Sequence, residues 1–532
     1  MKNNEKRRKK KFLPEDIGTR ILLVILGILC IVLIAAIVWQ EYYFTHTYQK
    51  GELAKLEQGV EKPRLKFMTE QPETEELYED ETGDGSTAQA TGISAAKRKK
   101  RPTVVESQES ITLKTQLTGV LPGIHGPGKT AADLIAQANR MAQMYDYDNA
   151  IELLENCTSY KEDTDMQDAV GRYETAKSRC VEYPADQVTH VFFHTLIKDP
   201  DKAFDGDQYE AGYNQYMVTI TEFNSIIQQM YDRGYVMVTL NDVAPAVTDS
   251  EGNTTFTSGT ILLPEGKKPF VLSQDDVSYY HYMDGDGFAS RLIVDENGDI
   301  RNEYIEDDGS VSVGDYDMVP LIDRFVEKHP DFSYRGAKGY VALTGYDGIL
   351  GYRTDLSYKT RQDLDVYQEE FFAQHPNFSE QDYENECEQA KKVAEAMKED
   401  GWLFTSHTWG HVGLGENATT WEQFKADTDK WSERVEPLIG ETDVLIYAFG
   451  GDIGGVEDYS GERFEYLKSK GFDYFCGVDS AVYWLQIRNR YVRQARRNID
   501  GYRMYYNPDM LSDLFDVSEA WDPKRPAYVP PI

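Results

Sequence analysis

The chain has 532 residues and a formal charge of −35 at neutral pH. Hydrophobic residues make up 40% of it and 36 residues are tyrosines, so it can bury a large core, and its length favours at least two folded units. Such an acidic chain repels the phosphate backbone of nucleic acids, which argues against a nucleic-acid-binding function.

An apolar segment near the N-terminus predicts a membrane anchor. Residues 21–40 contain no charged side chain and are long enough to cross a bilayer as a helix. A signal peptide, the alternative, would have a shorter apolar region before a small-residue cleavage site, whereas Trp39, Tyr42 and Tyr43 are typical of a membrane interface. Residues 1–20 carry eight Lys/Arg against three Asp/Glu. We therefore expect a cytoplasmic basic tail, a single transmembrane helix and an extracellular body in the cell membrane.

The next two regions differ in composition. Residues 41–129 are largely polar and acidic, which predicts an extracellular, mostly disordered stalk. Residues 130–183 have apolar residues at helical spacing and resemble a tetratricopeptide unit, which cannot bury its own apolar face alone. We expect a helical spacer docked on the next domain, or alternatively a module that binds a protein partner. Cys157 and Cys180 could meet across a helical hairpin, but free thiols are the expected state.

Residues 186–532 alternate strand-like and helix-like segments, which predicts an α/β domain with parallel strands. Strands are expected at 188–197, 236–240, 269–273, 339–344, 401–405, 443–449 and 474–478, and helices at 221–235, 318–328, 385–400, 421–439 and 462–470. Seven or eight such units indicate a (β/α) barrel that is incomplete or distorted. Asn-Gly and Asp-Gly turns near 284–316 predict a β-hairpin insertion, and a second insertion is expected near 353–384.

Polar residues follow three of the predicted strands, where barrels of this type carry their functional groups. His194 comes directly after Val191-Phe-Phe in the first predicted strand, Asp275 and Asp276 follow the third, and His407 and His411 follow the fifth. Two histidines four residues apart can bind one Zn²⁺ through neutral nitrogens. A chance pair that only forms hydrogen bonds is the alternative. The acidic pair favours a metal, because a dication needs an anionic ligand.

On these motifs residues 188–505 resemble the polysaccharide deacetylases with a NodB-homology domain (carbohydrate esterase family 4). The family's Thr-Phe-Asp-Asp motif appears as Ser-Gln-Asp-Asp ending at Asp276, and its His-Ser/Thr-x-x-His motif runs from His407 to His411. Phe-His-Thr around His194 is similar to the opening motif of the circularly permuted, extracellular branch that acts on poly-N-acetylglucosamine. In that branch this histidine replaces one near the C-terminus, and no histidine follows His411 here.

The resemblance implies roles for these five residues. Asp276, His407 and His411 would bind one divalent metal, with Zn²⁺ the expected ion and a fourth position open for water. Asp275 would be the general base, and His194 would protonate the departing sugar amine. The implied function is a membrane-anchored, extracellular, metal-dependent deacetylase that removes N-acetyl groups from an N-acetylglucosamine-containing polysaccharide of the cell wall or of a secreted polymer.

Further residues follow from the same comparison. Trp409, Phe449 and Gly450 are expected to contact substrate. The family's Arg-x-Pro-Tyr-Gly motif is reduced to Tyr-Ala-Phe-Gly-Gly-Asp at 447–452, without the arginine that orients the catalytic aspartate. Either Arg497 or Arg503 substitutes for it, or Asp275 is less well positioned. The second case favours a catalytically impaired glycan-binding or scaffolding protein, and hydrolysis of another acyl or amide group is a third hypothesis.

Overall fold

A computed structural model describes residues 130–532. The predicted tail (1–20), transmembrane helix (21–40) and stalk (41–129) lie outside the described residues. Between residue 130 and the C-terminus, no helix combines the length and the apolar character that a membrane crossing requires.

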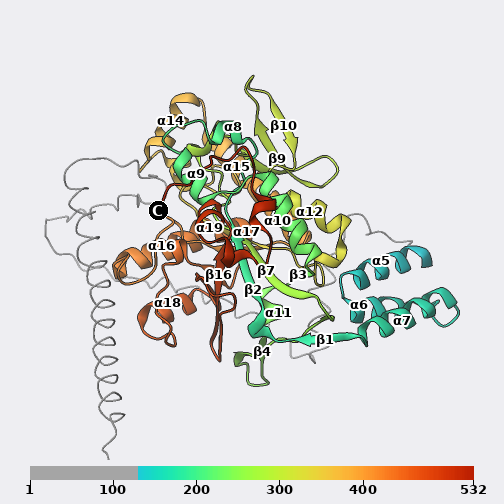
Figure 1. The fold of residues 1–532 in the computed structure, drawn as a ribbon. Coiled ribbons are helices and arrows are strands. Elements are labelled where there is room, and N and C mark those ends of the chain that lie inside the picture. Colours follow the sequence, from blue (N-terminus) through green and yellow to red (C-terminus); the bar gives the residue numbers. More distant parts are fainter. Residues whose placement is uncertain (1–129) are drawn as a thin grey trace, which may run out of the picture. The chain divides into compact units, whose positions relative to one another are not determined.

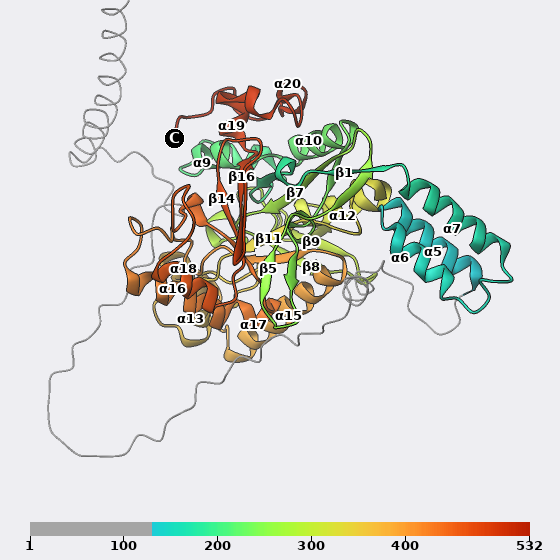
Figure 2. The ribbon, with the colours of Figure 1, turned by 90° about the horizontal axis from the view of Figure 1, so that it is seen from below.

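Seven parallel strands close into a barrel, and each strand pairs with the next barrel strand in chain order (Figures 1 and 2). They are β2 (Thr189–Phe193), β7 (Lys268–Gln274), β11 (Tyr340–Leu343), β12 (Leu403–Ser406), β13 (Val444–Ile446), β14 (Tyr474–Val478) and β16 (Tyr491–Asn498). The last strand, β16, pairs with the first, β2. The prediction of a (β/α) barrel is confirmed.

The barrel is distorted between β7 and β11. The first half of β7 pairs with β3 (Tyr235–Met237), and only its last two residues pair with β11. The strand predicted at 236–240 is shorter than expected, because Thr239 caps the short helix α11 (Leu240–Val243). An eighth strand is therefore present only at the amino end of the barrel.

Helices cover the outside of the barrel and bury its main core. They are α9 (Glu210–Tyr216), α10 (Ile220–Asp232), α12 (Met318–Lys328), α15 (Glu380–Glu399), α16 (Trp421–Arg434), α17 (Glu436–Ile439) and α18 (Glu462–Ser469). In α10, a reciprocal cap between Thr219 and Glu222 fixes the first turn. The helix then buries Phe223, Ile226 and Met230 in the core shared with the strands. Their i, i+3, i+7 spacing is that of one helix face.

Two of the predicted boundaries are wrong for local reasons. The helix predicted at 421–439 is broken at Val435, because Pro437 cannot donate the backbone hydrogen bond that would continue α16 and instead lies in the first turn of α17. The strand predicted at 443–449 ends at Ile446. The chain there enters a 3₁₀ turn, η5 (Ala448–Gly450), in which Phe449 has a positive φ.

Three helices precede the barrel: α5 (Ala131–Gln143), α6 (Tyr147–Glu155) and α7 (Thr164–Lys177). Their apolar faces join a second core with side chains from the strands. The Tyr145 hydroxyl donates to the carbonyl of Asp331, and the backbone N–H of Arg335 donates to the carbonyl of Met144. β1 (Cys180–Tyr183) then pairs with β6 (Ile261–Pro264). The four cysteines in the described part of the chain are free thiols.

Two insertions follow the carboxyl ends of β7 and β11. The first is a three-stranded antiparallel sheet of β8 (Arg291–Val294), β9 (Ile300–Ile305) and β10 (Val311–Gly314), in line with the predicted hairpin region. The second contains α13 (Leu356–Thr360) and α14 (Val366–Gln374). After β14, β15 (Leu485–Arg488) pairs with β16, which leads to α19 (Gly501–Tyr506) and α20 (Val517–Ala520).

Candidate metal centre

The carboxyl ends of β2, β7 and β12 bring the predicted site residues together. The backbone N–H of Asp275 donates to the carbonyl of Phe193, 2.8 Å away, and that of His407 donates to Leu343, 3.0 Å away. These bonds extend the parallel ladders by one residue. The chain then turns sharply at Asp276 and His411, where the backbone has positive φ. Because of these turns, the side chains of Asp276, His407 and His411 lie close together.

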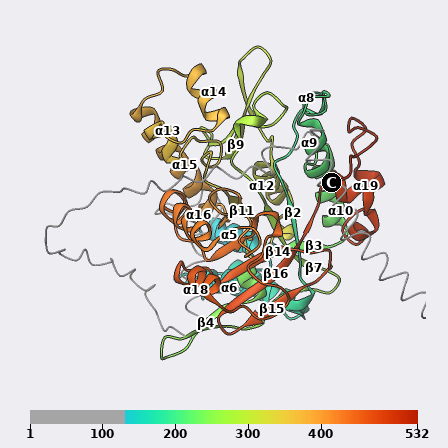
Figure 3. The same ribbon diagram turned by 90° about the vertical axis from the view of Figure 1, so that its left-hand side faces the viewer.

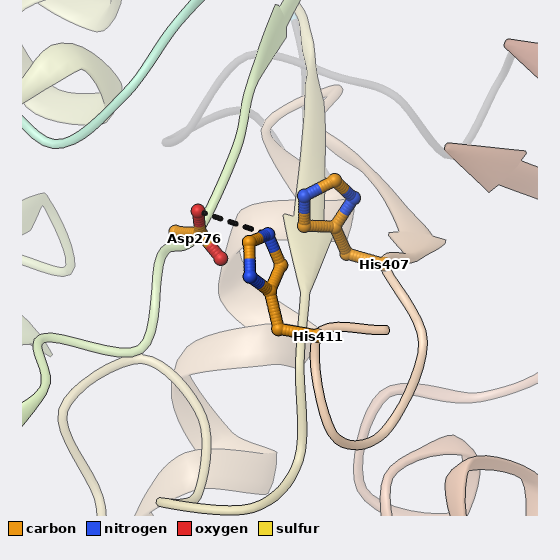
Figure 4. A group of neighbouring side chains, drawn as sticks. All are labelled: Asp276, His407 and His411. Carbon is orange, nitrogen blue, oxygen red and sulfur yellow. Dashed lines mark ion pairs between the residues drawn. The ribbon is translucent and has the colours of Figure 1, made fainter. Parts of the chain in front are cut away.

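Asp276, His407 and His411 form the one group of potential metal ligands found between residues 130 and 532 (Figure 4). One ligand atom from each lies within 4.8 Å of the other two. The Nε2 atom of His411 is 3.6 Å from Oδ2 of Asp276. Two ligands bound at ordinary Zn²⁺ distances in tetrahedral geometry would be roughly 3.4 Å apart. The donor set fits a divalent metal of this kind.

Hydrogen bonds outside the triad orient its members. Nδ1 of His407 is 2.9 Å from the carbonyl oxygen of Ile446, which can only accept, so Nδ1 carries the proton and Nε2 keeps its lone pair. The hydroxyl of Tyr280 donates to Oδ1 of Asp276 at 2.8 Å, which leaves Oδ2 toward His411. Hydrogen-bonded ligands of this type are typical of metal sites.

The protonation states also suit a metal. Burial lowers the pKa of His411 to about 4, although Asp276 opposes the shift, so this imidazole is neutral at neutral pH. Burial raises the pKa of Asp276, but His411 and His407 outweigh this effect and the net pKa is lowered. An ionised carboxylate beside a neutral imidazole is a combination that binds Zn²⁺.

Backbone strain is concentrated at this site. Asp276, Thr408, His411 and Phe449 all have positive φ, between 52° and 66°, in a region that L-residues occupy rarely. The buried carboxylate of Asp427 accepts hydrogen bonds from the backbone N–H groups of Trp409 and Gly410, at 2.9 and 2.7 Å. The Thr408 hydroxyl accepts from Val412. These contacts hold the strained loop that carries both histidines.

Arg496 is the arginine that pairs with Asp275, so the expectation of Arg497 or Arg503 is wrong. Its two terminal nitrogens donate to the two carboxylate oxygens at 2.7 and 2.9 Å, and its side chain is fully buried. Successive side chains of a strand point to opposite faces, so Arg497 on β16 faces away and pairs with Asp513. Arg503 lies on α19 and donates to Asn498.

Arg496 is itself held from a second side. One of its terminal nitrogens also donates to the hydroxyl of Ser273, which forms a further hydrogen bond with Nε2 of His190. Burial raises the pKa of Asp275, but the charge of Arg496, aided by His407, outweighs it and holds the pKa well below its usual range. Asp275 is therefore ionised and fixed beside the triad, with its Oδ2 3.8 Å from Nε2 of His407.

His194 lines a cavity with two members of the triad, Asp276 and His411. Its Nδ1 is 3.1 Å from the carbonyl oxygen of Tyr216, so Nδ1 donates and Nε2 is directed elsewhere. This small cavity is lined by His194, Asp276 and His411 together with Met217 and the aromatic side chains of Tyr216, Tyr280, Tyr282 and Tyr346. Of the five predicted catalytic and ligand residues, His194, Asp276 and His411 line this cavity, whereas Asp275 and His407 are buried and do not line it.

The three residues expected to contact substrate have different positions. Phe449 is 54% exposed and its ring centroid is 4.3 Å from that of His411, so it lies at the edge of the site. Gly450 packs against Val478. The half-buried indole of Trp409 donates to a carboxylate oxygen of Asp355 in the second insertion. Substrate binding by these residues stays a prediction.

The sequence interpretation missed Arg496, Tyr280 and Asp427. Arg496 was one position away from a named candidate, and only the strand register distinguishes the two. Tyr280 follows Asp276 by four residues and Asp427 lies on α16. Neither carries a sequence signal that connects it to the motifs.

Comparison of the chain with protein-family models, with curated proteins and with solved structures found no match. The chemistry of the site is therefore the basis for a functional proposal.

Proposed function

We propose that the protein is a metal-dependent N-deacetylase that acts on an N-acetylglucosamine-containing polysaccharide. The observation that carries this proposal is the convergence of the Asp276, His407 and His411 triad with Asp275, an ionised carboxylate held by a buried arginine. A separate imidazole, His194, lines the same cavity. A ligand set, a base beside it and an acid that shares a cavity with two of the ligands are the groups that amide hydrolysis requires.

Asp276, His407 and His411 would hold a Zn²⁺ ion, which when bound polarises an amide carbonyl and lowers the pKa of a water molecule. A fourth position would then remain for substrate or water. The hydroxyl of Tyr280 and the carbonyl of Ile446 keep the ligand atoms directed inward.

Asp275 acts as the general base. Both of its oxygens accept hydrogen bonds from Arg496, but each retains a lone pair that can accept the proton of the attacking water. Arg496 keeps the carboxylate ionised and in place, and it does so at the cost of weaker basicity, because it stabilises the charged form.

His194 acts as the general acid. Since its Nδ1 donates to the Tyr216 carbonyl, Nε2 is the atom that can deliver a proton to the departing nitrogen. For this role the ring must be the imidazolium. The carbon–nitrogen bond breaks as this proton is transferred, and water and the acetamide yield acetate and a free sugar amine.

Acetate release is the direct test. Incubation of the protein with Zn²⁺ and β-linked N-acetylglucosamine oligomers is expected to release acetate, and a chelator or His407→Ala is expected to stop it. Asp275→Asn is the matched variant, because it removes the base and leaves the triad intact. It is expected to retain Zn²⁺ and lose activity by about a thousandfold. Zn²⁺-bound wild-type protein that releases no acetate from any such oligomer would reject the proposal.

A glycan-binding or scaffolding protein on the same fold is the second candidate. The altered 447–452 segment favours it, since Asp452 there is bound to Arg493 and Tyr459 and forms part of a closed loop. The pairing of Arg496 with Asp275 favours the enzyme instead, because it restores the missing guanidinium. If Asp275→Asn protein retains its full effect on the polysaccharide in cells, the binding function is the correct one.

The location is also a proposal. Residues 21–40 would anchor the protein in the cell membrane with its N-terminus in the cytoplasm and residues 130–532 outside, where such polysaccharides occur. Protease added to intact cells is expected to remove the barrel domain and leave the tail protected. The helical region from α5 to α7 would be the site for any protein partner.

A further inference from the structure

An exposed strip of aromatic rings begins beside the candidate site and continues over the C-terminal segment. It consists of Tyr502, Tyr505, Tyr506 and Tyr528, called here the tyrosine strip. Tyr505 and Tyr506 are each 38% exposed and Tyr528 is 58% exposed. Groups of exposed aromatic rings are typical of binding sites, because aromatic rings exposed to water do not contribute hydrophobic burial to the stability of the fold.

The topology places the strip at the same end of the barrel as the metal centre. α19, which carries three of the tyrosines, follows directly after the carboxyl end of β16. α9 ends at Tyr216 in the connection that follows the carboxyl end of β2. Because β16 and β2 are paired neighbours, α19 and α9 lie side by side (Figure 3). Functional groups of such barrels gather at this end.

A series of close contacts connects the cavity to the strip. The rings of His194 and Tyr216 have centroids 6.4 Å apart. α9, which ends at Tyr216, packs against α19, the helix that carries Tyr502. The strip therefore lies on the helix next to the one that carries Tyr216 into the cavity wall.

The rings of the strip are continuous with one another. The centroids of Tyr502 and Tyr506 are 4.6 Å apart, those of Tyr505 and Tyr506 are 4.9 Å apart, and those of Tyr505 and Tyr528 are 6.1 Å apart. Trp521 supports Tyr505 from behind at 6.1 Å. The surface offers ring faces at short intervals, as an extended ligand with repeated apolar faces requires.

We propose that the tyrosine strip binds the sugar residues of the substrate chain that lie beyond the residue being deacetylated. This inference rests on the proposed function. Pyranose rings present apolar C–H faces to aromatic rings, while tyrosine hydroxyls can hydrogen-bond the sugar hydroxyls. The strip lies on the helix packed beside the cavity wall, and the acidic chain disfavours a polyanionic occupant. A neutral or amino-sugar polymer is the occupant that fits.

Two double variants of the full chain test the strip. Tyr505→Ala with Tyr528→Ala removes two exposed rings, whereas Tyr505→Phe with Tyr528→Phe keeps the rings and is the matched control. The substrates are a hexamer and a dimer of β-linked N-acetylglucosamine. We expect the alanine pair to raise KM for the hexamer about tenfold, with kcat unchanged and dimer kinetics unaffected, and the phenylalanine pair to behave as wild type.

A binding measurement separates this inference from the proposed function. Hexamer affinity is measured by calorimetry in Asp275→Asn protein, which cannot turn it over, with and without the alanine pair. A loss of about tenfold supports the strip even if wild-type protein releases no acetate. Equal hexamer affinity with and without the two rings would overturn the inference while acetate release stands. Equal losses for hexamer and dimer would also overturn it, because the rings would then support the cavity itself.

Discussion

Arg496 donates two hydrogen bonds to Asp275, a residue 221 positions earlier in the chain. The arginine comes from β16, the strand on one side of β2, and the aspartate comes from the end of β7, the strand on its other side. The pair therefore spans the interior of the barrel near its carboxyl end. A planar guanidinium that binds both carboxylate oxygens fixes the orientation of Asp275 as well as its charge.

Replacing Arg496 with lysine is expected to lower kcat about a hundredfold with little change in KM. Lysine keeps the positive charge but cannot form the paired hydrogen bonds, so Asp275 rotates away from its position, and small misplacements of a catalytic group have effects of about this size. Steady-state acetate release measures it.

The adjacent arginine provides the control for that experiment. Arg497 lies on the same strand, faces the other way and pairs with Asp513. Arg497→Lys is expected to leave kcat within about twofold of wild type, since this buried arginine points away from Asp275 and its pair with Asp513 affects local stability and not the site. If Arg496→Lys also kept the wild-type kcat, Asp275 would not depend on this pair for its function.

Loss of one ligand is expected to abolish tight Zn²⁺ binding. His407→Ala leaves two protein ligands. Deleting a hydrogen-bond partner of a metal ligand lowers metal affinity roughly 10–100-fold, and deleting the ligand itself should lower the Zn²⁺ affinity by more than that. Calorimetry with Zn²⁺ measures the affinity, and the stoichiometry for wild type is expected to be one ion per chain. His281→Ala is the control, because this imidazole pairs with Asp284 outside the triad. Equal affinity in both variants would contradict the assigned ligands.

The barrel itself was predictable because its strands are short apolar runs between amphipathic helices. β7 and β14 appear close to where the apolar runs indicated, and α12 has the predicted bounds of Met318–Lys328. The exception is β16, which was not predicted as a strand. Arg493, Arg496 and Arg497 make it appear polar, yet all three are buried, because each is paired with a carboxylate elsewhere in the fold.

Only the site residues that belong to short sequence motifs could be predicted. His407 and His411 are four residues apart, and such a spacing predicts a shared ligand directly. Contacts between segments that are distant in the chain produce no such spacing in the sequence. Tyr280 was missed because its hydroxyl reaches back to Asp276 only after the chain adopts positive φ at Asp276 and Tyr279, which no periodicity reveals. Arg496 was missed because a shift of one residue reverses which face of a strand a side chain occupies.

Tyr280→Phe is expected to weaken Zn²⁺ binding about tenfold. The variant removes the hydroxyl that donates to Asp276 and keeps the ring, whose stacking on Tyr346 and Tyr282 maintains the cavity wall. Competition with a chelator of known affinity measures the change. Tyr282→Phe, in the same stack of rings, is the control and is expected to retain wild-type affinity. An unchanged affinity in Tyr280→Phe would show that this hydrogen bond does not orient the ligand.

Asp427 is expected to make the stability of the histidine loop depend on pH. Burial raises its pKa to about 6, although the N–H groups of Trp409 and Gly410 oppose the shift. In the unfolded chain the same carboxyl ionises near its ordinary pKa of about 4, so between these values the folded protein binds more protons and stability falls as the pH rises. Relative to Asp427→Asn, the free energy of unfolding of wild type should fall by up to about 3 kcal/mol from pH 4 to pH 7.

Urea unfolding in the presence of a chelator, at pH 4, 5, 6 and 7, measures this difference without a contribution from metal. Asp429, on the same helix, is the control with the opposite sign. Burial raises its pKa, but hydrogen bonds from Lys470 and Tyr466 outweigh this and the net pKa is lowered. Its contribution to stability is thus complete above pH 4 and is lost only at lower pH, so Asp429→Asn and wild type should differ by a constant amount across the series. A constant difference for Asp427→Asn as well would mean that this carboxyl is ionised in the folded protein throughout, and that it holds the loop as a charged acceptor.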